Sequence, residues 1–215
     1  MMRTYAGDDP QMRAAGTRAA TSAMRSGRLV IGPADYHYAV VTDAFSGPGL
    51  QRLREVRGIS EGTAVPVFID RRTTLHAMWG RVPRDAEVLA RTFWPGPLTL
   101  IGKPQLSLAW TAGVGDAVAV RMPLHPWMLQ LVTAVGPIAG TGAHVAGEPL
   151  AVTLAQCDTS GVSIGLDGGE LPGGPASTVV DLRSGVEVVR EGAITAEQIE
   201  QCLGSEHRGS TPPAR

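Results

Sequence analysis

Two arginines stand at the ends of runs of small apolar residues, where a charge is costly unless it has a partner. Arg121 follows "AVAV" in "AVAVRMP", and Arg190 follows "VEVV" in "VEVVREG". A guanidinium at the end of a buried strand is stabilised by a carboxylate or by an anionic ligand. Each position by itself leaves both partners open. Two such arginines in one chain indicate a site for an anionic ligand.

A second group of candidates follows the strand-like run "RLVIGP". The stretch "PADYHYAV" places Asp35, Tyr36, His37 and Tyr38 directly after it. Open α/β sheets form their sites at the carboxyl ends of strands, so these side chains are candidates for ligand binding. Ordinary turn and capping chemistry explains the same residues equally well.

Several common sites have no counterpart in the sequence. No Walker A pattern and no strand–G-x-G-x-x-G–helix fingerprint occurs, and the run "GLDGGELPGGP" lacks the Lys-Ser/Thr that holds phosphate and metal. We interpret this run as a mobile surface loop. Cys157 and Cys202 have no C-x-x-C spacing and no histidine cluster nearby, so neither a disulfide framework nor a zinc site is predicted. No residue is assigned to a metal.

Helical and strand-like segments alternate along the chain, which predicts a single α/β domain with some antiparallel pairing near the C-terminus. Apolar spacing and caps predict helices over residues 10–27, 47–58, 83–93, 125–136, 149–157 and 195–203. Short apolar runs predict strands over residues 28–33, 64–70, 98–103, 117–123, 137–142, 162–169, 177–183 and 186–192.

Composition limits the partners. The chain has 215 residues and a formal net charge of −1, which does not favour nucleic-acid binding, although a local basic groove stays open. No apolar run is long enough to span a bilayer, so no membrane partner is expected. The N-terminus carries acidic residues where a secretion signal has an apolar core. We therefore expect a cytoplasmic protein; its oligomeric state is left open.

The stretch "FWPGPLTL", residues 93–100, predicts a rigid corner that leads into a strand. Pro95 and Pro97 fix their own φ angles, and Gly96 supplies the freedom that they remove. This stretch is followed in order by "AVAVRMPLHP", "TGAHVAGEP" and "STVVDLRSGVEVVREGAI". With these motifs the chain resembles the YrdC/Sua5 family of L-threonylcarbamoyl-AMP synthases from about residue 20 to residue 203.

The resemblance implies one YrdC-like domain over residues 13–203, with helices packed around a twisted mixed sheet that has a concave ligand-binding face. Residues 1–12 are expected to form a flexible N-terminus and residues 204–215 a disordered tail. Family members make threonylcarbamoyl-adenylate from L-threonine, bicarbonate and ATP and release pyrophosphate, usually with Mg²⁺. The product serves tRNA modification. ATP, an amino acid and bicarbonate are thus the implied small molecules, and tRNA or double-stranded RNA is an implied partner that the net charge does not support.

Residues at the positions of the family motifs are predicted to form the site. Those predicted to bind substrate or nucleotide are Pro33, Asp35, Tyr36, His37, Tyr38, Thr99, Thr141, Gly142, Ser177, Thr178 and Arg190. Those predicted to be catalytic are Arg57, Arg121 and His144.

The departures from the family pattern lie within these motifs. The family's P-T-D-T-x-Y-G-L is "PADYHYAV" here, so Ala34 and Tyr36 replace both threonines. K-x-R falls on "REVRGIS", with Arg57 for lysine and Ile59 for arginine, and S-A-N becomes "GAH", with His144 for asparagine. Each lost hydrogen bond to a charged group weakens binding by about 1.5–3 kcal/mol.

Three functions follow from this comparison. The chain is a threonylcarbamoyl-AMP synthase in which Arg57 and His144 contact phosphate. Alternatively, it is a repurposed enzyme for another carbamoyl- or acyl-adenylate or small ligand, with Tyr36, His37 and His144 as specificity groups. The third option is a non-catalytic protein that binds nucleotide or RNA.

Overall fold

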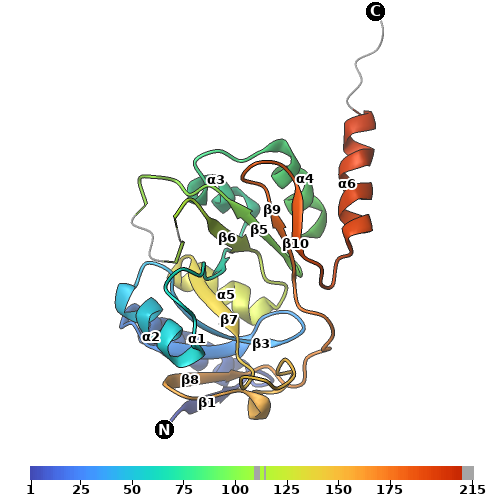
Figure 1. Cartoon of the computed structure of the whole chain (residues 1–215). Coiled ribbons are helices and arrows are strands. Elements are labelled where there is room, and N and C mark those ends of the chain that lie inside the picture. Colours follow the sequence, from blue (N-terminus) through green and yellow to red (C-terminus); the bar gives the residue numbers. More distant parts are fainter. Residues whose placement is uncertain (109–111, 114, 210–215) are drawn as a thin grey trace, which may run out of the picture.

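A ten-stranded mixed sheet forms the centre of this computed structural model, which describes residues 1–108, 112–113 and 115–209 and the side chains up to residue 205 (Figure 1). The strand order is β1-β8-β2-β3-β7-β4-β6-β5-β9-β10. The strands are β1 (Arg3–Ala6), β2 (Leu29–Pro33), β3 (Tyr38–Asp43), β4 (Val67–Phe68), β5 (Leu98–Gly102), β6 (Val118–Arg121), β7 (Ile138–Gly142), β8 (Val162–Asp167), β9 (Thr178–Asp181) and β10 (Glu187–Arg190).

Helices cover both faces of the sheet. Those in the described ranges are α1 (Pro10–Arg25), α2 (Gly47–Arg57), α3 (Leu75–Met78), α4 (Arg84–Phe93), α5 (Pro126–Val135) and α6 (Ala196–Gly209), with the 3-10 turns η1 (Arg72–Thr74) and η2 (Leu154–Gln156). Figure 1 shows α1, α2 and α5 around the half that contains β3, β7 and β8, whereas α3 and α4 lie near β5, β6 and β9. α6 packs along α4 at the outer side.

Local sequence determines where α1 and α2 begin and end. The Asp9 side chain accepts two backbone hydrogen bonds at the start of α1, and Pro10 occupies the first turn, where its missing N–H costs nothing. Ser46 caps α2 through its side-chain oxygen. Gly58 ends α2 with φ at 60°, a left-handed conformation that favours glycine. These signals are all visible in the sequence.

The two faces of the sheet have different neighbours. On one face α2, α3, α4 and α6 enclose the larger core, to which β5 and β6 contribute Leu98, Leu100, Val118 and Val120. On the other face α1 and α5 pack over β2, β3 and β8 around Trp127. Side chains alternate along a strand, so the remaining residues of β5 and β6 face away from the larger core. That second set lines a cavity.

The predicted corner at "FWPGPLTL" connects the ends of three strands. The Trp94 indole donates a hydrogen bond to the Leu98 carbonyl at 2.7 Å, which closes the corner on itself. The backbone N–H of Gly96 donates to the Met122 carbonyl, directly after β6, at 2.9 Å. The N–H of Thr178, in β9, donates to the carbonyl of Pro97 at 2.9 Å. The corner therefore holds the start of β5 against β6 and β9.

The predicted fold class is confirmed: the protein is a single α/β domain with a mixed sheet and helices packed around it. The flexible N-terminus is a correction, because residues 3–6 form β1, which pairs in parallel with β8 and buries Tyr5. So short a strand, with one buried side chain, leaves no periodic pattern to recognise. β3 is also absent from the predicted strands, because it follows β2 after only a four-residue turn.

Two predicted boundaries near the C-terminal half differ from the structure. The helix predicted over residues 149–157 is only the turn η2, which Thr153 and Gln156 close with reciprocal side-chain hydrogen bonds. α6 continues to Gly209, beyond the predicted domain end at residue 203, and residues 210–215 of the predicted tail lie outside the described residues. Within the described ranges, no helix is both long enough and apolar enough to cross a membrane.

Candidate active site

A cavity of about 390 Å³ lies on the second face of the sheet. Seven neighbouring strands contribute to its lining: β3, β7, β4, β6, β5, β9 and β10. The turn between β2 and β3, the segment after β7 and the segment before β9 form its walls. Its floor is made of small or apolar side chains: Ala39, Phe68, Ile101, Ala119, Gly140 and Val179. A cavity of this size and lining suits a small molecule.

An ion pair between Arg121 and Asp35 stands in the wall of this cavity. Arg121 Nη2 donates to Asp35 Oδ2, and the backbone N–H of Leu124 donates to Oδ1. The Asp35 side chain is only 1% exposed. The buried Nε of Arg121 has no hydrogen-bond partner among the described residues. The carboxylate thus holds Nη2, and the remaining N–H donors of the guanidinium suit an anionic ligand.

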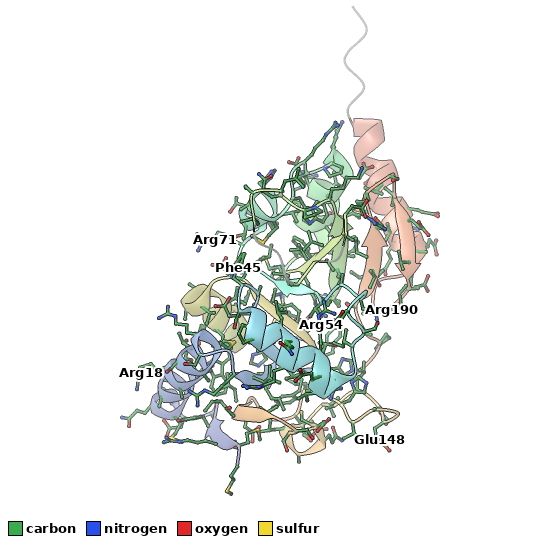
Figure 2. All side chains as sticks on the ribbon, turned by 60° about the vertical axis from the view of Figure 1, so that its left-hand side comes forward. Arg18, Phe45, Arg54, Arg71, Glu148 and Arg190 are labelled. Carbon is green, nitrogen blue, oxygen red and sulfur yellow. The ribbon has the colours of Figure 1, made fainter. Side chains whose placement is uncertain are left out.

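The second cation, Arg190, enters the cavity from the edge strand β10 (Figure 2). Its Nε and Nη2 donate to the carbonyl of Ser177 at 3.2 and 2.8 Å, and Nη2 also donates to the Ser177 hydroxyl at 3.2 Å. That hydroxyl is 3.1 Å from the Thr99 hydroxyl. Burial and the nearby charge of Arg121 lower the pKa of Arg190. Two arginines therefore share the cavity with the single carboxylate of Asp35, and one positive charge is left over.

Thr141, Gly142 and His144 line the opposite end, at β7. The His144 imidazole lies against Gly142, where a Cβ atom would be 2.9 Å from Nδ1. This Nδ1 is buried and has no partner among the described residues. Burial, and after it the charge of Arg57, lower the pKa of His144. The ring is therefore neutral at neutral pH.

The turn between β2 and β3 contributes Tyr36, His37 and Tyr38 to the lining. Burial and, to a smaller extent, the charge of Arg121 lower the pKa of His37. The Tyr38 hydroxyl donates to the Gly169 carbonyl at 2.7 Å and accepts from the Gly168 N–H at 2.9 Å. Burial raises the pKa of Tyr38. Its hydroxyl is thus tied to the segment after β8, and Tyr36 and His37 remain as candidate ligand contacts.

Three predicted site residues are not brought to the cavity. Arg57 instead pairs with Asp158 at 3.1 Å and donates to the His144 carbonyl, with 8% of its side chain exposed. Thr178 faces away and accepts hydrogen bonds from the backbone N–H groups that follow β10. Pro33 ends β2 and packs on Gly168. Arg57 therefore does not line the cavity, and its described partners are Asp158 and the His144 carbonyl.

The sequence analysis missed two kinds of site residue. The first is the apolar floor of the cavity. Side chains alternate along "AVAV" and "LTLIG", so one face of these strands could have been predicted to line a cavity. The second is the loop residues Leu150, Pro175 and Ala176, which have no local signal. Asp158, the partner of Arg57, lies outside the cavity lining and has no local signal either.

The described residues do not form a metal centre. No group of three or more His, Cys, Asp or Glu side chains within the described ranges could hold a metal ion. Of the described residues that line the cavity, only Asp35 carries a carboxylate, and Arg121 and a backbone N–H already occupy its oxygens. Mg²⁺ prefers free oxygen ligands. These residues therefore do not fit a protein-held Mg²⁺.

Comparison with known proteins gives a consistent result. A family model named Sua5_yciO_yrdC and described as "Telomere recombination" matches residues 22–192. A Mycobacterium tuberculosis (strain H37Rv) protein, named as a candidate threonylcarbamoyl-AMP synthase, is 34% identical over 211 residues, which cover 95% of this chain and 96% of that protein. Threonylcarbamoyl-AMP synthase of Pyrococcus abyssi is 33% identical over 193 residues, 87% of this chain but 57% of that enzyme.

The solved structures agree in fold. Pyrococcus abyssi Sua5 complexed with L-threonine superposes with a TM-score of 0.84 at 28% identity, over 95% of this chain and 61% of that one. The chain thus spans somewhat more than half of the archaeal protein and nearly the whole of the mycobacterial one. With a family model matching most of its sequence, the chain belongs to the Sua5/YrdC family.

Proposed function

We propose that the protein is a threonylcarbamoyl-AMP synthase that uses ATP, L-threonine and bicarbonate. The observation that carries this proposal is the pair Arg121 and Arg190, which line one cavity where, among the described lining residues, only Asp35 carries a carboxylate. Two positive charges that lie near each other and are partly buried destabilise each other, and an anionic ligand bound between them relieves this repulsion. The proposed reaction is the one for which the relatives are named.

In this proposal the two arginines bind the phosphates of ATP. Bicarbonate and the amino group of threonine form a carbamate with loss of water. A carbamate oxygen then attacks the α-phosphorus of ATP, the bond to the bridging oxygen breaks, and pyrophosphate leaves with that oxygen. Arg121 and Arg190 spread the negative charge that develops, from positions fixed by Asp35 and Ser177.

Threonine and the nucleoside would occupy the rest of the cavity. The hydroxyls of Thr99 and Ser177, which bond each other, lie beside Arg190, and Thr141 lines the end at β7. Mg²⁺, where it takes part, would arrive with the phosphates of ATP, because the cavity offers it no free carboxylate. A cytoplasmic location, the use of the product in tRNA modification and direct binding of double-stranded RNA stay predictions of the family resemblance.

Pyrophosphate release tests the proposal directly. We expect release from ATP that depends on both L-threonine and bicarbonate. Release that needs some other amine or acid would favour the repurposed enzyme instead. A well-folded protein that shows no ATP binding by calorimetry would contradict both and favour a non-catalytic role.

Replacing Arg190 by Ala tests the charge argument. In the described part of the chain its hydrogen bonds go to the carbonyl and hydroxyl of Ser177, so no carboxylate loses a partner. We expect the Kd for ATP to rise about tenfold or more, because a bond to a charged phosphate is lost, with little change in the unfolding midpoint. Arg18→Ala is the matched control, since Arg18 lies on α1 and does not line the cavity (Figure 2). Equal ATP affinity in the two variants would remove Arg190 from the site.

A further inference from the structure

His37 belongs to a turn whose backbone is held by two hydrogen bonds. The N–H of Ala34 donates to the His37 carbonyl at 3.1 Å, which closes the turn between β2 and β3. The N–H of Gly173 donates to the Tyr36 carbonyl at 3.1 Å, so the segment between β8 and β9 also supports the turn. The His37 side chain therefore starts from a fixed backbone, and it lines the cavity.

Titratable groups from three parts of the cavity act on the His37 imidazole. They are Arg121 at the end of β6, Asp35 in the same turn and, with the smallest effect, His144 after β7. A backbone hydrogen bond at Gly174, before β9, stabilises the protonated ring, but burial has the larger effect and lowers the pKa. The ring is therefore neutral at neutral pH and has a lone pair to offer.

One nitrogen of the His37 ring is left to accept a proton. A neutral imidazole has one N–H donor and one acceptor nitrogen, and the backbone hydrogen bond at Gly174 uses the donor. No group in the described ranges donates to the other nitrogen. Neither ring nitrogen of His37 is among the buried polar atoms without a partner, whereas Nδ1 of His144 is one of them. The acceptor nitrogen of His37 is therefore accessible.

The other described lining groups are less suited to accept a proton beside Arg121. The oxygens of Asp35 already bond this arginine and a backbone N–H. The Tyr38 hydroxyl is tied to the segment after β8, and burial raises its pKa. The charge that acts on His144 is that of a different arginine, which lies outside the lining. His37 is thus the accessible proton acceptor on which the charge of Arg121 acts.

The proposed reaction needs a base at this place. Threonine enters as an ammonium ion, which has no lone pair and cannot attack bicarbonate. In the carbamate, only one carbon and one oxygen atom separate the nitrogen from the α-phosphorus that the oxygen attacks. If Arg121 binds the phosphates, as the proposed function requires, a group beside Arg121 is also close to the amine.

We propose that His37 is the general base that takes a proton from the ammonium group of the amino-acid substrate. This inference rests on the proposed function and adds a catalytic residue to it. The lone pair of the freed amine forms a bond to the bicarbonate carbon, the C–OH bond breaks, and the hydroxide leaves as water with a second proton from the nitrogen. The proton on His37 then passes to solvent. The charge of Asp35 and the backbone hydrogen bond at Gly174 stabilise the imidazolium until it does.

The experiment measures pyrophosphate release over a range of pH in the wild type, in His37→Gln and in His37→Ala. We expect His37→Gln to lower kcat at pH 7 about a hundredfold, with the KM for ATP unchanged. In the wild type, kcat/KM for threonine should rise with pH and level off once His37 is neutral. In His37→Gln it should keep rising into the alkaline range, where the ammonium group loses its proton without a base.

Two further measurements separate a base from a structural side chain. Added imidazole should restore part of the activity of His37→Ala, because it supplies the missing proton acceptor. His76→Gln is the matched control, since His76 is an exposed residue on α3 outside the cavity lining, and it should leave kcat unchanged. Circular dichroism verifies that each variant is folded.

Equal kcat at pH 7 in folded His37→Gln and His76→Gln would overturn the inference and leave the proposed function standing. A loss that is the same at every pH and that imidazole does not reverse would overturn it too, since the ring would then only shape the cavity. If the wild type releases no pyrophosphate with threonine and bicarbonate at any pH, the proposed function fails and the base fails with it. A loss that shrinks at alkaline pH, with rescue by imidazole, supports both.

Discussion

Inside the protein, Arg121 and the backbone N–H of Leu124 face the Asp35 carboxylate. The arginine at the end of β6 therefore has a structural task. Of the two alternatives that the sequence left open for Arg121, the internal ion pair is present, and the ligand contact belongs to the proposed function. Arg57 differs, because it pairs with Asp158 and the His144 carbonyl and does not line the cavity.

Replacing Arg121 by Ala should destabilise the fold, not only the binding of ligand. The substitution leaves the Asp35 carboxylate buried without its counter-charge, which costs about 3–5 kcal/mol of unfolding free energy. Urea denaturation measures this loss. The double variant Asp35→Asn/Arg121→Ala should recover part of it, because no buried charge is left. An unchanged unfolding free energy in Arg121→Ala would mean that the ion pair is not maintained in solution.

At the scale of elements, the end of α2 is hydrogen-bonded to two loops near the cavity. Arg54, which Figure 2 shows on α2, donates to the carbonyls of Ser60 and Thr63 at 2.9 and 2.8 Å. Arg57, in the same turn, holds the segment that carries His144. One helix end thus positions two parts of the cavity wall. Arg57, which a motif comparison assigns to phosphate, and Arg54 both bond the loops here.

The end of β5 packs closely against the Trp79 indole. A Cβ at Gly102, the last residue of β5, would lie 2.3 Å from Cδ2 of the buried Trp79 indole. We expect Gly102→Ala to lower the unfolding free energy by about 1–3 kcal/mol, because the ring has no room to move. Chemical denaturation provides the measurement. Gly62→Ala is the control, since no atom lies within 4 Å of the added carbon there. Equal stability in both variants would contradict this packing.

At the scale of the whole molecule, three histidines share one property. Burial is the main cause that lowers the pKa of His37, His125 and His144, all close to the cavity or to the Asp35 turn. The folded protein therefore binds protons at these sites less readily than the unfolded chain does. Hydrogen bonds lower the pKa values of Asp158 and Asp181, so these carboxylates change the stability only at more acidic pH.

We expect the unfolding free energy to fall as the pH decreases from about 7 to about 5, where an unfolded histidine gains its proton. The sign follows from linkage: a lowered pKa in the folded state means that protons favour the unfolded chain. Denaturant titrations at several pH values measure the slope. His37→Gln should reduce it. A stability that is constant over this range would show that these rings are not buried in solution.

The sequence led to the fold class, the helix caps and the corner at "FWPGPLTL", because these depend on neighbouring residues. Of the residues it predicted for the site, Arg121 and Arg190, which end recognisable strands, and His144, which a family motif indicated, line the cavity. It failed at β1 and β3, which lack a pattern of their own, and at Arg57, whose assignment came from a motif. The local pattern around Arg57 contains nothing that reveals Asp158.

The amino-acid sequence by itself thus determined which segments are helices and strands, because caps, glycines and alternating side chains act over a few residues. Only the tertiary structure decided which charges are paired and which face the cavity. The partner of Arg57 lies 101 residues away, and that of Arg121 lies 86 residues away. An electrostatic interaction depends on distance in space, and the order of strands in the sheet sets that distance.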